Sequence, residues 1–320
     1  MTAPSPIILF SSLSAKISLY ARVLQSARRF DKQARLIGVD SDPNCPATRM
    51  VEEFAPIPPL KEMDLVNLTK YCQELNVTHV IPTRDDELGF WSAKSNQLRK
   101  NGIQVMVSNK SAIETCQDKL VFSRTLQSLA IPPIPSSDNL STLPGDHFAV
   151  KERSGSASRS IGLNLKAEKA MMHAERLKQP IFQPMTQGRE FSAESWINLS
   201  GQCQGILLRW RSKVVDGEAH ESEIFEHSEW EQRMRESFEA IRGLSGHVLG
   251  QVIVDSNQNL HLVEINPRLG GASPLALAAG LHSIEWFLLE SAGRESEISK
   301  NPSFDKKLKL RKVNGEAIIS

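Results

Sequence analysis

The first third of the chain alternates short runs of β-favouring residues with segments of helical periodicity. The β-favouring runs cover residues 7–10, 36–40, 79–82 and 103–107, and the helical segments between them cover about 15–29, 63–75 and 87–100. Strands separated by helices of this length form βαβ crossovers, because parallel neighbours need a connection that long. The pattern therefore predicts an α/β fold whose N-terminal part is a parallel sheet covered by helices on both faces.

A parallel sheet of this kind raises the question of a dinucleotide site after its first strand. Asp40 ends the second β-favouring run, where the ribose-binding acid of a dinucleotide fold lies. The first turn, residues 11–16, reads Ser-Ser-Leu-Ser-Ala-Lys and lacks the pattern GxGxxG. This argues against a dehydrogenase, and Asp40 is better interpreted as a hydrogen-bond acceptor at the strand end.

A loop of small residues lies in the middle of the chain. Prolines within residues 131–135 end two preceding helical segments and mark a boundary. Two strand-like runs then flank residues 153–160, where serine predominates. Consecutive backbone N–H groups in such a turn form a nest for an anion, and Lys151, Arg153 and Arg159 add positive charge. The sequence thus predicts an anion-binding loop, with a flexible surface hairpin as the alternative.

Two strand-like runs near the C-terminal end are joined by a polar turn at residues 256–259. If Asp255 lies opposite Leu260 in an antiparallel hairpin, counting along the strands places Gln251 opposite Glu264, about 5 Å away on the same face. We therefore expect these two polar side chains to lie together.

Asn266 alternates onto the same face as Glu264, within a run of apolar strand residues. An unpaired carboxylate there would be costly, and oxygen ligands favour hard cations. Gln251, Glu264 and Asn266 therefore predict a Mg²⁺ or Mn²⁺ site, and Arg268 is placed to meet a phosphoryl oxygen. The alternative is an ordinary hairpin with a solvated polar face.

Two arginines could bind an anionic ligand directly. Arg209 and Arg211 share a face if the strand around them is regular. They could grip the carboxylate of a substrate, which makes Arg209 a catalytic candidate. Alternatively, one of them pairs with a neighbouring acid such as Glu218 or Glu221, and the sequence leaves both interpretations open.

The composition limits the classes of protein that fit. The chain has 320 residues, of which 40% are hydrophobic and 23% charged, and its net charge is +1 at pH 7. Nucleic-acid-binding proteins usually have a basic excess, so we expect no nucleic-acid partner. No apolar stretch is long enough to span a membrane, and the first residues lack the basic region of a signal peptide, so we expect a cytoplasmic location without membrane association.

Taken in chain order, these segments resemble the ATP-grasp superfamily, in particular one synthetase half of the carbamoyl-phosphate synthetase large subunit. The resemblance spans nearly the whole chain. It rests on Pro82-Thr83-Arg84-Asp85-Asp86-Glu87-Leu88, Cys116-Gln117-Asp118-Lys119, Lys151 with the Gly155 loop, Gln183-Pro184-Met185 with Gly188-Arg189-Glu190-Phe191-Ser192, and Gln251 with Glu264-Ile265-Asn266-Pro267-Arg268. It implies a Rossmann-like domain at residues 1–108 before a two-part α+β ATP-grasp module, with a lid subdomain at 109–182 and a metal-binding subdomain at 183–320.

The resemblance also implies an ATP site between the two subdomains. The adenine would lie against the backbone near Gln183 and Met185, and Lys119 and Lys151 would meet the α- and β-phosphates. Relatives commonly carry a glutamate for the ribose hydroxyls where this chain has Gln183, which is an uncharged and weaker acceptor. The implied nucleotide contacts are Lys119, Lys151, Ser154, Gly155, Ser156, Gln183, Met185 and Glu190, the last in the ribose or metal network.

The implied activity is that of an ATP-dependent carboxylate–amine ligase that forms an acyl phosphate, ADP and phosphate. Lys151, Arg268 and Arg209 are its catalytic candidates, and ATP and Mg²⁺ (or Mn²⁺) its cofactors. Its partners would be a small acid, with amino acids among the candidates, and an amine, while a homodimer remains open. Two alternatives are a non-catalytic or regulatory ATP-binding protein and an enzyme that forms carboxy or carbamoyl phosphate from bicarbonate.

Overall fold

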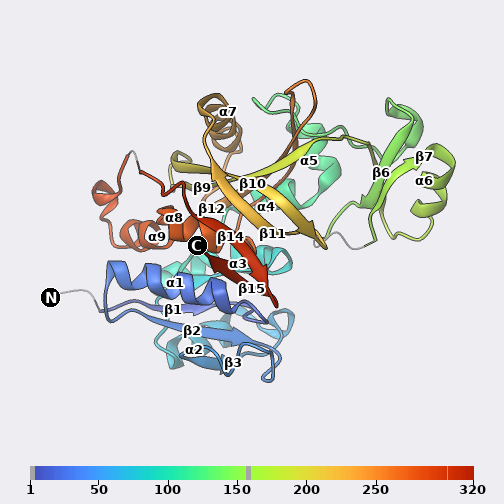
Figure 1. The fold of residues 1–320 in the computed structure, drawn as a ribbon. Coiled ribbons are helices and arrows are strands. Elements are labelled where there is room, and N and C mark those ends of the chain that lie inside the picture. Colours follow the sequence, from blue (N-terminus) through green and yellow to red (C-terminus); the bar gives the residue numbers. More distant parts are fainter. Residues whose placement is uncertain (1–3, 156–159, 301) are drawn as a thin grey trace.

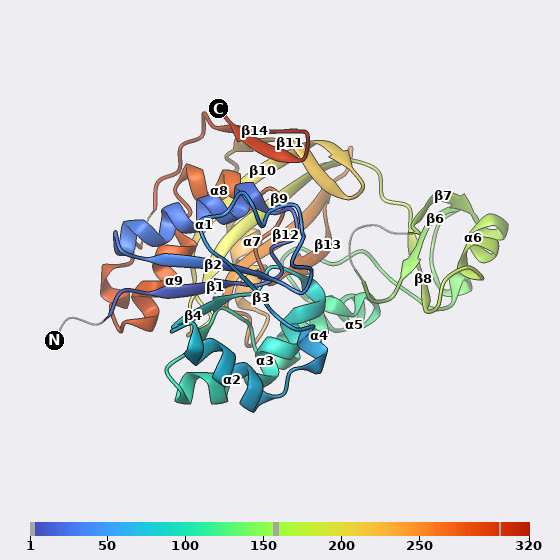
Figure 2. The same ribbon diagram turned by 90° about the horizontal axis from the view of Figure 1, so that it is seen from below.

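The computed structural model describes residues 4–155, 160–300 and 302–320 (Figure 1). Within these ranges the strands form sheets of five, seven and three strands. Figures 1 and 2 show the five-stranded sheet beside the seven-stranded sheet, with the three-stranded sheet standing to one side of both. The α/β fold class, with a parallel N-terminal sheet followed by an α+β module, is confirmed.

The N-terminal sheet is parallel, as the alternation of strands and helices predicted. Its strand order is β3-β2-β1-β4-β5. Its strands are β1 (Ile7–Phe10), β2 (Arg35–Asp40), β3 (Phe54–Pro56), β4 (His79–Ile81) and β5 (Gln104–Val105). The sequence did not reveal β3, because three residues ending in proline are too few to show a period.

Helices cover both faces of this sheet. The buried side of α1 (Ile17–Phe30) packs against one face, and α2 (Leu65–Glu74) and α3 (Asp85–Lys100) cover the other. Because β1 lies between β2 and β4, the connections that follow β1 and β4 lie side by side at the carboxyl ends of the strands.

Two short helices, α4 (Lys110–Gln117) and α5 (Lys119–Thr125), lead out of the N-terminal domain. Asp118 caps α5, and its carboxylate accepts hydrogen bonds from the first backbone N–H groups of that helix. The helix ends earlier than the sequence suggested. Leu129 and Ile131, which follow it, are instead buried in the core beneath the seven-stranded sheet.

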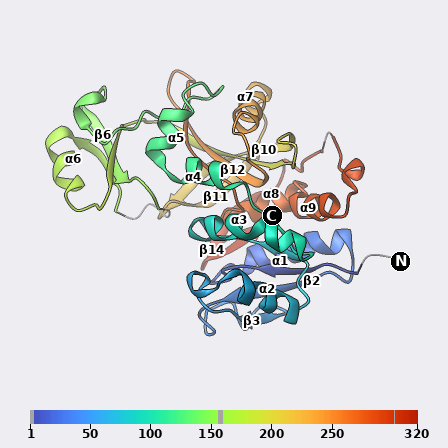
Figure 3. The same ribbon diagram turned by 180° about the vertical axis from the view of Figure 1, so that it is seen from behind.

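The three-stranded sheet has the order β7-β6-β8 and carries α6 (Ala167–Ala174) on one face. Its strands are β6 (His147–Glu152), β7 (Gly162–Lys166) and β8 (Pro180–Pro184). Figure 3 shows this part of the chain from behind, again apart from the two larger sheets. The boundary expected between residues 182 and 183 falls inside β8.

The seven-stranded sheet has the order β13-β12-β9-β10-β11-β14-β15, and each pair of adjacent strands is antiparallel. Its strands are β9 (Arg189–Ile197), β10 (Cys203–Val215), β11 (Glu218–Phe225), β12 (Gly246–Val254), β13 (Leu260–Asn266), β14 (Lys309–Val313) and β15 (Glu316–Ile319). One face packs against α7 (Ser228–Glu239) and the α4–α5 segment. The other face packs against α8 (Ser273–Ala279) and α9 (Ser283–Ser291), which also contact α1.

The C-terminal residues form a hairpin at the edge of this sheet. Its strands β14 and β15 are joined at Asn314 and Gly315, with φ of 51° and 85°. Positive φ at both central residues is typical of a tight hairpin turn, which Asn-Gly favours. None of the described helices is long and apolar enough to cross a membrane.

Candidate functional site

The predicted metal ligands on β12 and β13 come together, because Gln251 lies opposite Glu264. The turn end of the hairpin differs from the expectation. Leu260 pairs with the residue before Asp255. A β-bulge, with Val263 as the extra residue, makes up this difference of one position. The expected pairing is therefore present, although the counting that led to it was wrong at two compensating places.

Asn266 lies on the same face of β13 as Glu264, and its Nδ2 donates to Glu264 Oε1 at 2.7 Å. This bond uses the amide nitrogen and leaves the amide oxygen for a cation. Among the described residues, no group of three or more His, Cys, Asp and Glu side chains could hold a metal ion. One carboxylate and two amides fit Mg²⁺ only if phosphate oxygens complete its coordination, as they do in many nucleotide sites.

Two lysines from different elements lie near Glu264. Lys151 on β6 is 9% exposed, and Lys119 is the first residue of α5. Burial lowers the pKa of Lys151 to about 8, and the charge of Glu264 opposes this shift. Burial also lowers the pKa of Lys119, and the charge of Glu264 again opposes this shift. A carboxylate of the seven-stranded sheet thus lies close enough to two ammonium groups from outside that sheet for its charge to act on both.

Lys119 also ties α5 to the loop after β6. Its Nζ donates to the carbonyl of Gly155 at 2.9 Å, and its backbone N–H donates to the carbonyl of Arg153 at 3.1 Å. The Arg153 guanidinium in turn donates to both carboxylate oxygens of Asp118, at 2.9 and 2.8 Å. The charge of Arg153 is therefore paired with Asp118, so this arginine adds less to an anion site than the sequence suggested.

The same loop carries the other predicted phosphate contacts. Ser154 and Gly155 are exposed, and Gly155 has φ of 117°, which favours glycine. Ser156 and Arg159 lie outside the described residues, so their roles stay predictions.

Gln183 and Met185 lie at and just beyond the end of β8, beside the predicted adenine position. The register of β6 and β8 puts Gln183 on the same face as Lys151, away from α6. Gln183 is 5% exposed, and its Nε2 donates to Ser136 Oγ at 2.7 Å. The backbone N–H of Met185 donates to the His147 carbonyl at 2.8 Å. A ribose contact of Gln183 would have to share or replace its bond to Ser136.

The arginines of β10 pair with acids of the neighbouring strand β9. Arg209 Nε donates to Glu194 Oε1 at 2.6 Å, and both side chains are almost completely buried. Arg211 Nε donates to Glu190 Oε2 at 2.9 Å. The interpretation as ion pairs is thus correct, but with acids other than those considered. Arg209 is buried within the sheet and already paired, so its contact with a substrate carboxylate stays a prediction.

Glu218 and Glu221, the acids considered as arginine partners, pair instead with Lys312 and Arg311 of β14. The reason is strand order, because β14 lies beside β11 although it is far away in the sequence. Glu190, predicted in the ribose or metal network, has one carboxylate oxygen bound to Arg211.

A buried polar network extends from Arg209 to the helices. Glu194 Oε2 lies 2.9 Å from His247 Nε2, and His247 Nδ1 lies 2.9 Å from Ser283 Oγ. Although burial opposes ionisation, Arg209 and His247 lower the pKa of Glu194 to about 2. Ser273 Oγ, near the same histidine, accepts from the N–H of Gly270. The sequence analysis missed this network, and its one signal was an acid among the buried residues of β9.

Arg268 follows β13 and reaches the first turn of α3. Its Nε donates to Asp85 Oδ1 at 2.6 Å, and the Asp85 carbonyl accepts from the Gln117 side chain. Although burial favours the neutral form, Asp85 raises the pKa of Arg268 above its ordinary value. The charges of Glu264 and Glu218 act in the same direction. Asp85 belongs to one of the motifs on which the family resemblance rests, but no role was predicted for it.

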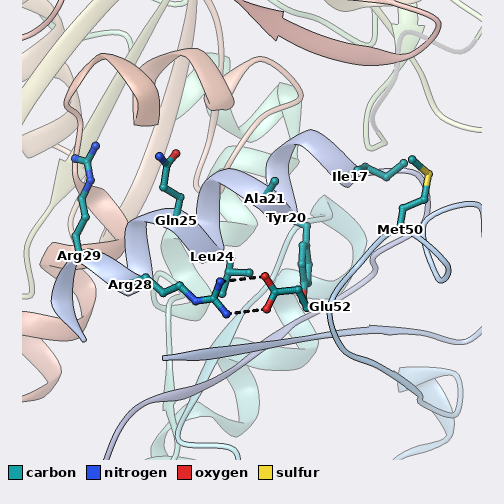
Figure 4. A pocket seen from close by; sticks show the side chains of 9 residues that line it. All are labelled: Ile17, Tyr20, Ala21, Leu24, Gln25, Arg28, Arg29, Met50 and Glu52. Carbon is teal, nitrogen blue, oxygen red and sulfur yellow. Dashed lines mark hydrogen bonds and ion pairs between the residues drawn. The ribbon is translucent and has the colours of Figure 1, made fainter. Parts of the chain in front are cut away.

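Figure 4 shows a hollow on the outer side of α1, crossed by the ion pair of Arg28 and Glu52. Tyr20 and Met50 also line it. None of the predicted nucleotide or metal contacts is among its lining residues, so we do not place the site there.

The model "ATP-grasp domain" matches residues 116–272, and the model "PylC-like, N-terminal domain" matches residues 8–106. No curated protein sequence matches the chain.

Similar solved structures include enzymes from several organisms. The biotin carboxylase domain of Hydrogenobacter thermophilus 2-oxoglutarate carboxylase is 13% identical, with a TM-score of 0.72, covering 95% of this chain and 73% of that one. N5-carboxyaminoimidazole synthetase from Staphylococcus aureus is 16% identical, with a TM-score of 0.72, covering 96% of this chain and 82% of that one. L-amino acid ligase from Bacillus licheniformis is 14% identical, with a TM-score of 0.68, covering 95% of this chain and 78% of that one.

At these identities the solved structures establish the fold, while the two family models match the chain from β1 to the residues just after β13. The order of the two models agrees with the order of the motifs in the sequence. The protein belongs to the ATP-grasp superfamily and has a PylC-like N-terminal domain.

Proposed function

We propose that the protein is an ADP-forming carboxylate–amine ligase that uses Mg-ATP. One observation carries the proposal: Lys151 of the small sheet and Lys119 of α5 both lie close enough to Glu264 of the large sheet for its charge to act on their pKa values. Two cations facing a carboxylate and two amides form a site for a triphosphate and its metal ion. Preorganised charges of this kind supply most of the catalysis in phosphoryl transfer.

We assign the following roles to the residues of the site. Lys119 and Lys151 bind the α- and β-phosphates, and the backbone near Gln183 and Met185 holds the adenine. Glu264, Asn266 and Gln251 would hold Mg²⁺, which when bound offsets the negative charge of the phosphate oxygens. Arg268 lies beyond them, and Asp85 holds its guanidinium toward the N-terminal domain.

Two steps then follow for the substrates. An oxygen of the carboxylate attacks the γ-phosphorus, and the bond to the β–γ bridging oxygen breaks, so that ADP leaves with the electron pair. The nitrogen of the amine next attacks the carbonyl carbon of the acyl phosphate. Phosphate leaves, the amine gives up a proton to solvent, and an amide remains. Lys151 and Arg268 offset the negative charge that both steps concentrate.

The proposal is tested by ADP release from Mg-ATP with pools of amino acids and small acids. Lys151→Ala and Glu264→Ala should each lower turnover by about a hundred- to a thousandfold, or roughly 3 to 4 kcal/mol. Lys169→Ala, at an exposed position of α6, is the matched control and should leave turnover unchanged. Either site variant with more than a tenth of wild-type turnover would contradict these roles.

The same assay separates the alternatives. Release of ADP with bicarbonate and no other acid would favour the enzyme that forms carboxy phosphate. Binding of ATP without release in any pool would favour a non-catalytic ATP-binding protein. Release of AMP would point to adenylation and overturn the acyl-phosphate route.

A further inference from the structure

The N-terminal sheet has a topological switch point that the proposed ATP site does not use. Its strand order reverses between β1 and β4, since the chain proceeds from β1 to β2 on one side and the later strands lie on the other. In open α/β sheets, ligands bind outside the carboxyl ends of the strands at such a switch point. Here the loop of residues 11–16 and the loop of residues 82–84 meet at that point.

The first of these loops has an unusual backbone. Ser12 and Ser14 have φ of 55° and 50°, in the left-handed region that non-glycine residues rarely adopt. The N–H of Ser14 donates to Asp40 Oδ2 at 2.8 Å, and Thr83 Oγ1 donates to the carbonyl of Ser11 at 2.6 Å. Strained loops held in place by their surroundings occur at binding sites more often than elsewhere. This loop ends at Lys16.

The Lys16 side chain folds back over the loop, and its Nζ donates to the carbonyl of Ser12 at 2.5 Å. Among the residues that the structure describes, no carboxylate lies within ion-pair distance of this ammonium group, which can donate two further hydrogen bonds. Burial lowers the pKa of Lys16 to about 8. Lys16 is half-buried, and the charges of Glu87 and Asp40 only partly oppose the effect of burial, so a bound anion would stabilise its charged form.

The other charged side chains around this switch point already have partners. Arg84 pairs with Asp86, and Arg268 pairs with Asp85. The Glu87 carboxylate accepts from the backbone N–H groups of Thr83 and Arg84, at 2.6 and 2.9 Å, and from the Ser11 hydroxyl. Lys16 differs from these neighbours, because within the described part of the chain no carboxylate lies within ion-pair distance of it.

Lys16 and the proposed metal ligand Glu264 are both close enough to Arg268 for charge effects. The largest charge effects on Lys16 come from Glu87, Arg84, Arg268 and Asp40. Those on Lys151 come from Glu264, Lys119 and Glu190. Arg268 responds to Glu264 as well as to Asp85. A substrate that reached from the γ-phosphate past Arg268 would thus meet Lys16.

We propose that Lys16 binds a substrate carboxylate that is not phosphorylated in the reaction, at the β1/β4 switch point. This inference rests on the proposed ligase function and names its substrate class. Such a carboxylate has two sources: the second carboxylate of a dicarboxylic acid, or the carboxylate of an amino acid that serves as the amine.

The test measures ADP release for four pairs of substrates. Butyrate and glutarate serve as acids, and each is combined with ethylamine or with glycine. Turnover should need glutarate if the acid carries the recognised group, and glycine if the amine carries it. In either case Lys16→Met should raise the KM for that substrate at least tenfold and leave the KM for ATP unchanged. Lys16→Arg should restore most of the loss.

Lys32→Met, at an exposed lysine just after α1, is the control, and ATP binding by titration shows that each variant is folded. The role of Lys16 would be overturned if butyrate with ethylamine were turned over as fast as the pairs that contain glutarate or glycine, or if Lys16→Met left the KM unchanged. Either result would leave the ligase function standing. No ADP release with any pair, despite ATP binding, would overturn the ligase function and this inference with it.

Discussion

The guanidinium of Arg268 and the carboxylate of Asp85 form a bidentate ion pair that joins the end of the predicted metal-binding strand to the first turn of α3. The two residues are 183 positions apart in the sequence, and their side chains are 17% and 16% exposed. The pair thus connects the N-terminal domain to the seven-stranded sheet, and it fixes the orientation of the Arg268 guanidinium.

Removing one partner of this pair should be costly, because the other charge is left half-buried and unpaired. We expect Asp85→Ala to lower the free energy of unfolding by about 3 kcal/mol, with most of the loss absent when Arg268→Ala is already present. Urea unfolding of the two single variants and the double variant measures this coupling. The exposed pair of Arg28 and Glu52 (Figure 4) is the control, with an expected coupling below about 1 kcal/mol. Equal coupling in both pairs would contradict the bridging role.

Gln183→Glu should strengthen ATP binding through the ribose. A carboxylate accepts charge-assisted hydrogen bonds from the ribose hydroxyls, and the Ser136 hydroxyl can donate to it in place of the present bond. We expect the KM for ATP to fall about tenfold, roughly 1.4 kcal/mol, and the KM for 2′-deoxy-ATP to change much less. Steady-state kinetics with both nucleotides measure the difference. An equal change for both would show that residue 183 does not contact the ribose.

ATP affinity should depend on pH through Lys151. The ordinary lysine pKa of 10.5 is lowered to about 8, so the free protein loses this charge as the pH rises through 8. Binding of a phosphate favours the charged form, so the Kd for ATP should rise as the pH goes from 7 to 9.5, by up to about tenfold per pH unit above the pKa. Calorimetric titrations at several pH values measure it, and Lys151→Met should flatten the profile. A wild-type Kd that stays constant over this range would contradict the assignment.

Glu290 on α9 should make stability depend on pH. It is 8% exposed, and its carboxylate accepts from Trp196 Nε1 at 3.3 Å. Burial raises its pKa from 4.5 to about 7, so between these values the folded state holds a proton that the unfolded state has lost. Stability therefore falls as the pH rises from 4.5 to 7, and the penalty is fully present above 7.

Glu290→Gln removes the titrating group and keeps an acceptor for the tryptophan. As the pH rises from 5 to 7.5, the free energy of unfolding of this variant should increase relative to that of wild type by up to about 3 kcal/mol. Chemical denaturation at both pH values measures this difference. Glu297→Gln, at an exposed residue paired with Arg294, is the control and should show little change. A constant difference between Glu290→Gln and wild type would rule out titration of this group.

The sequence by itself determined the parallel N-terminal sheet, the hairpin that carries Gln251 and Glu264, and the order of the family motifs. These features are local. Alternation of apolar and polar residues and the spacing of strands and helices depend on interactions within short segments. The pairing of Gln251 with Glu264 followed for the same reason, since only a short turn separates the two strands.

Only the tertiary structure decided which charges meet. Arg209 meets Glu194 because β9 and β10 lie side by side, and Glu218 meets Lys312 because the last hairpin returns to β11. Arg268 meets Asp85 because two sheets that are separate in the sequence pack around shared helices. A charged side chain selects its partner by distance in space and by exclusion from water. No pattern within a single segment contains that information.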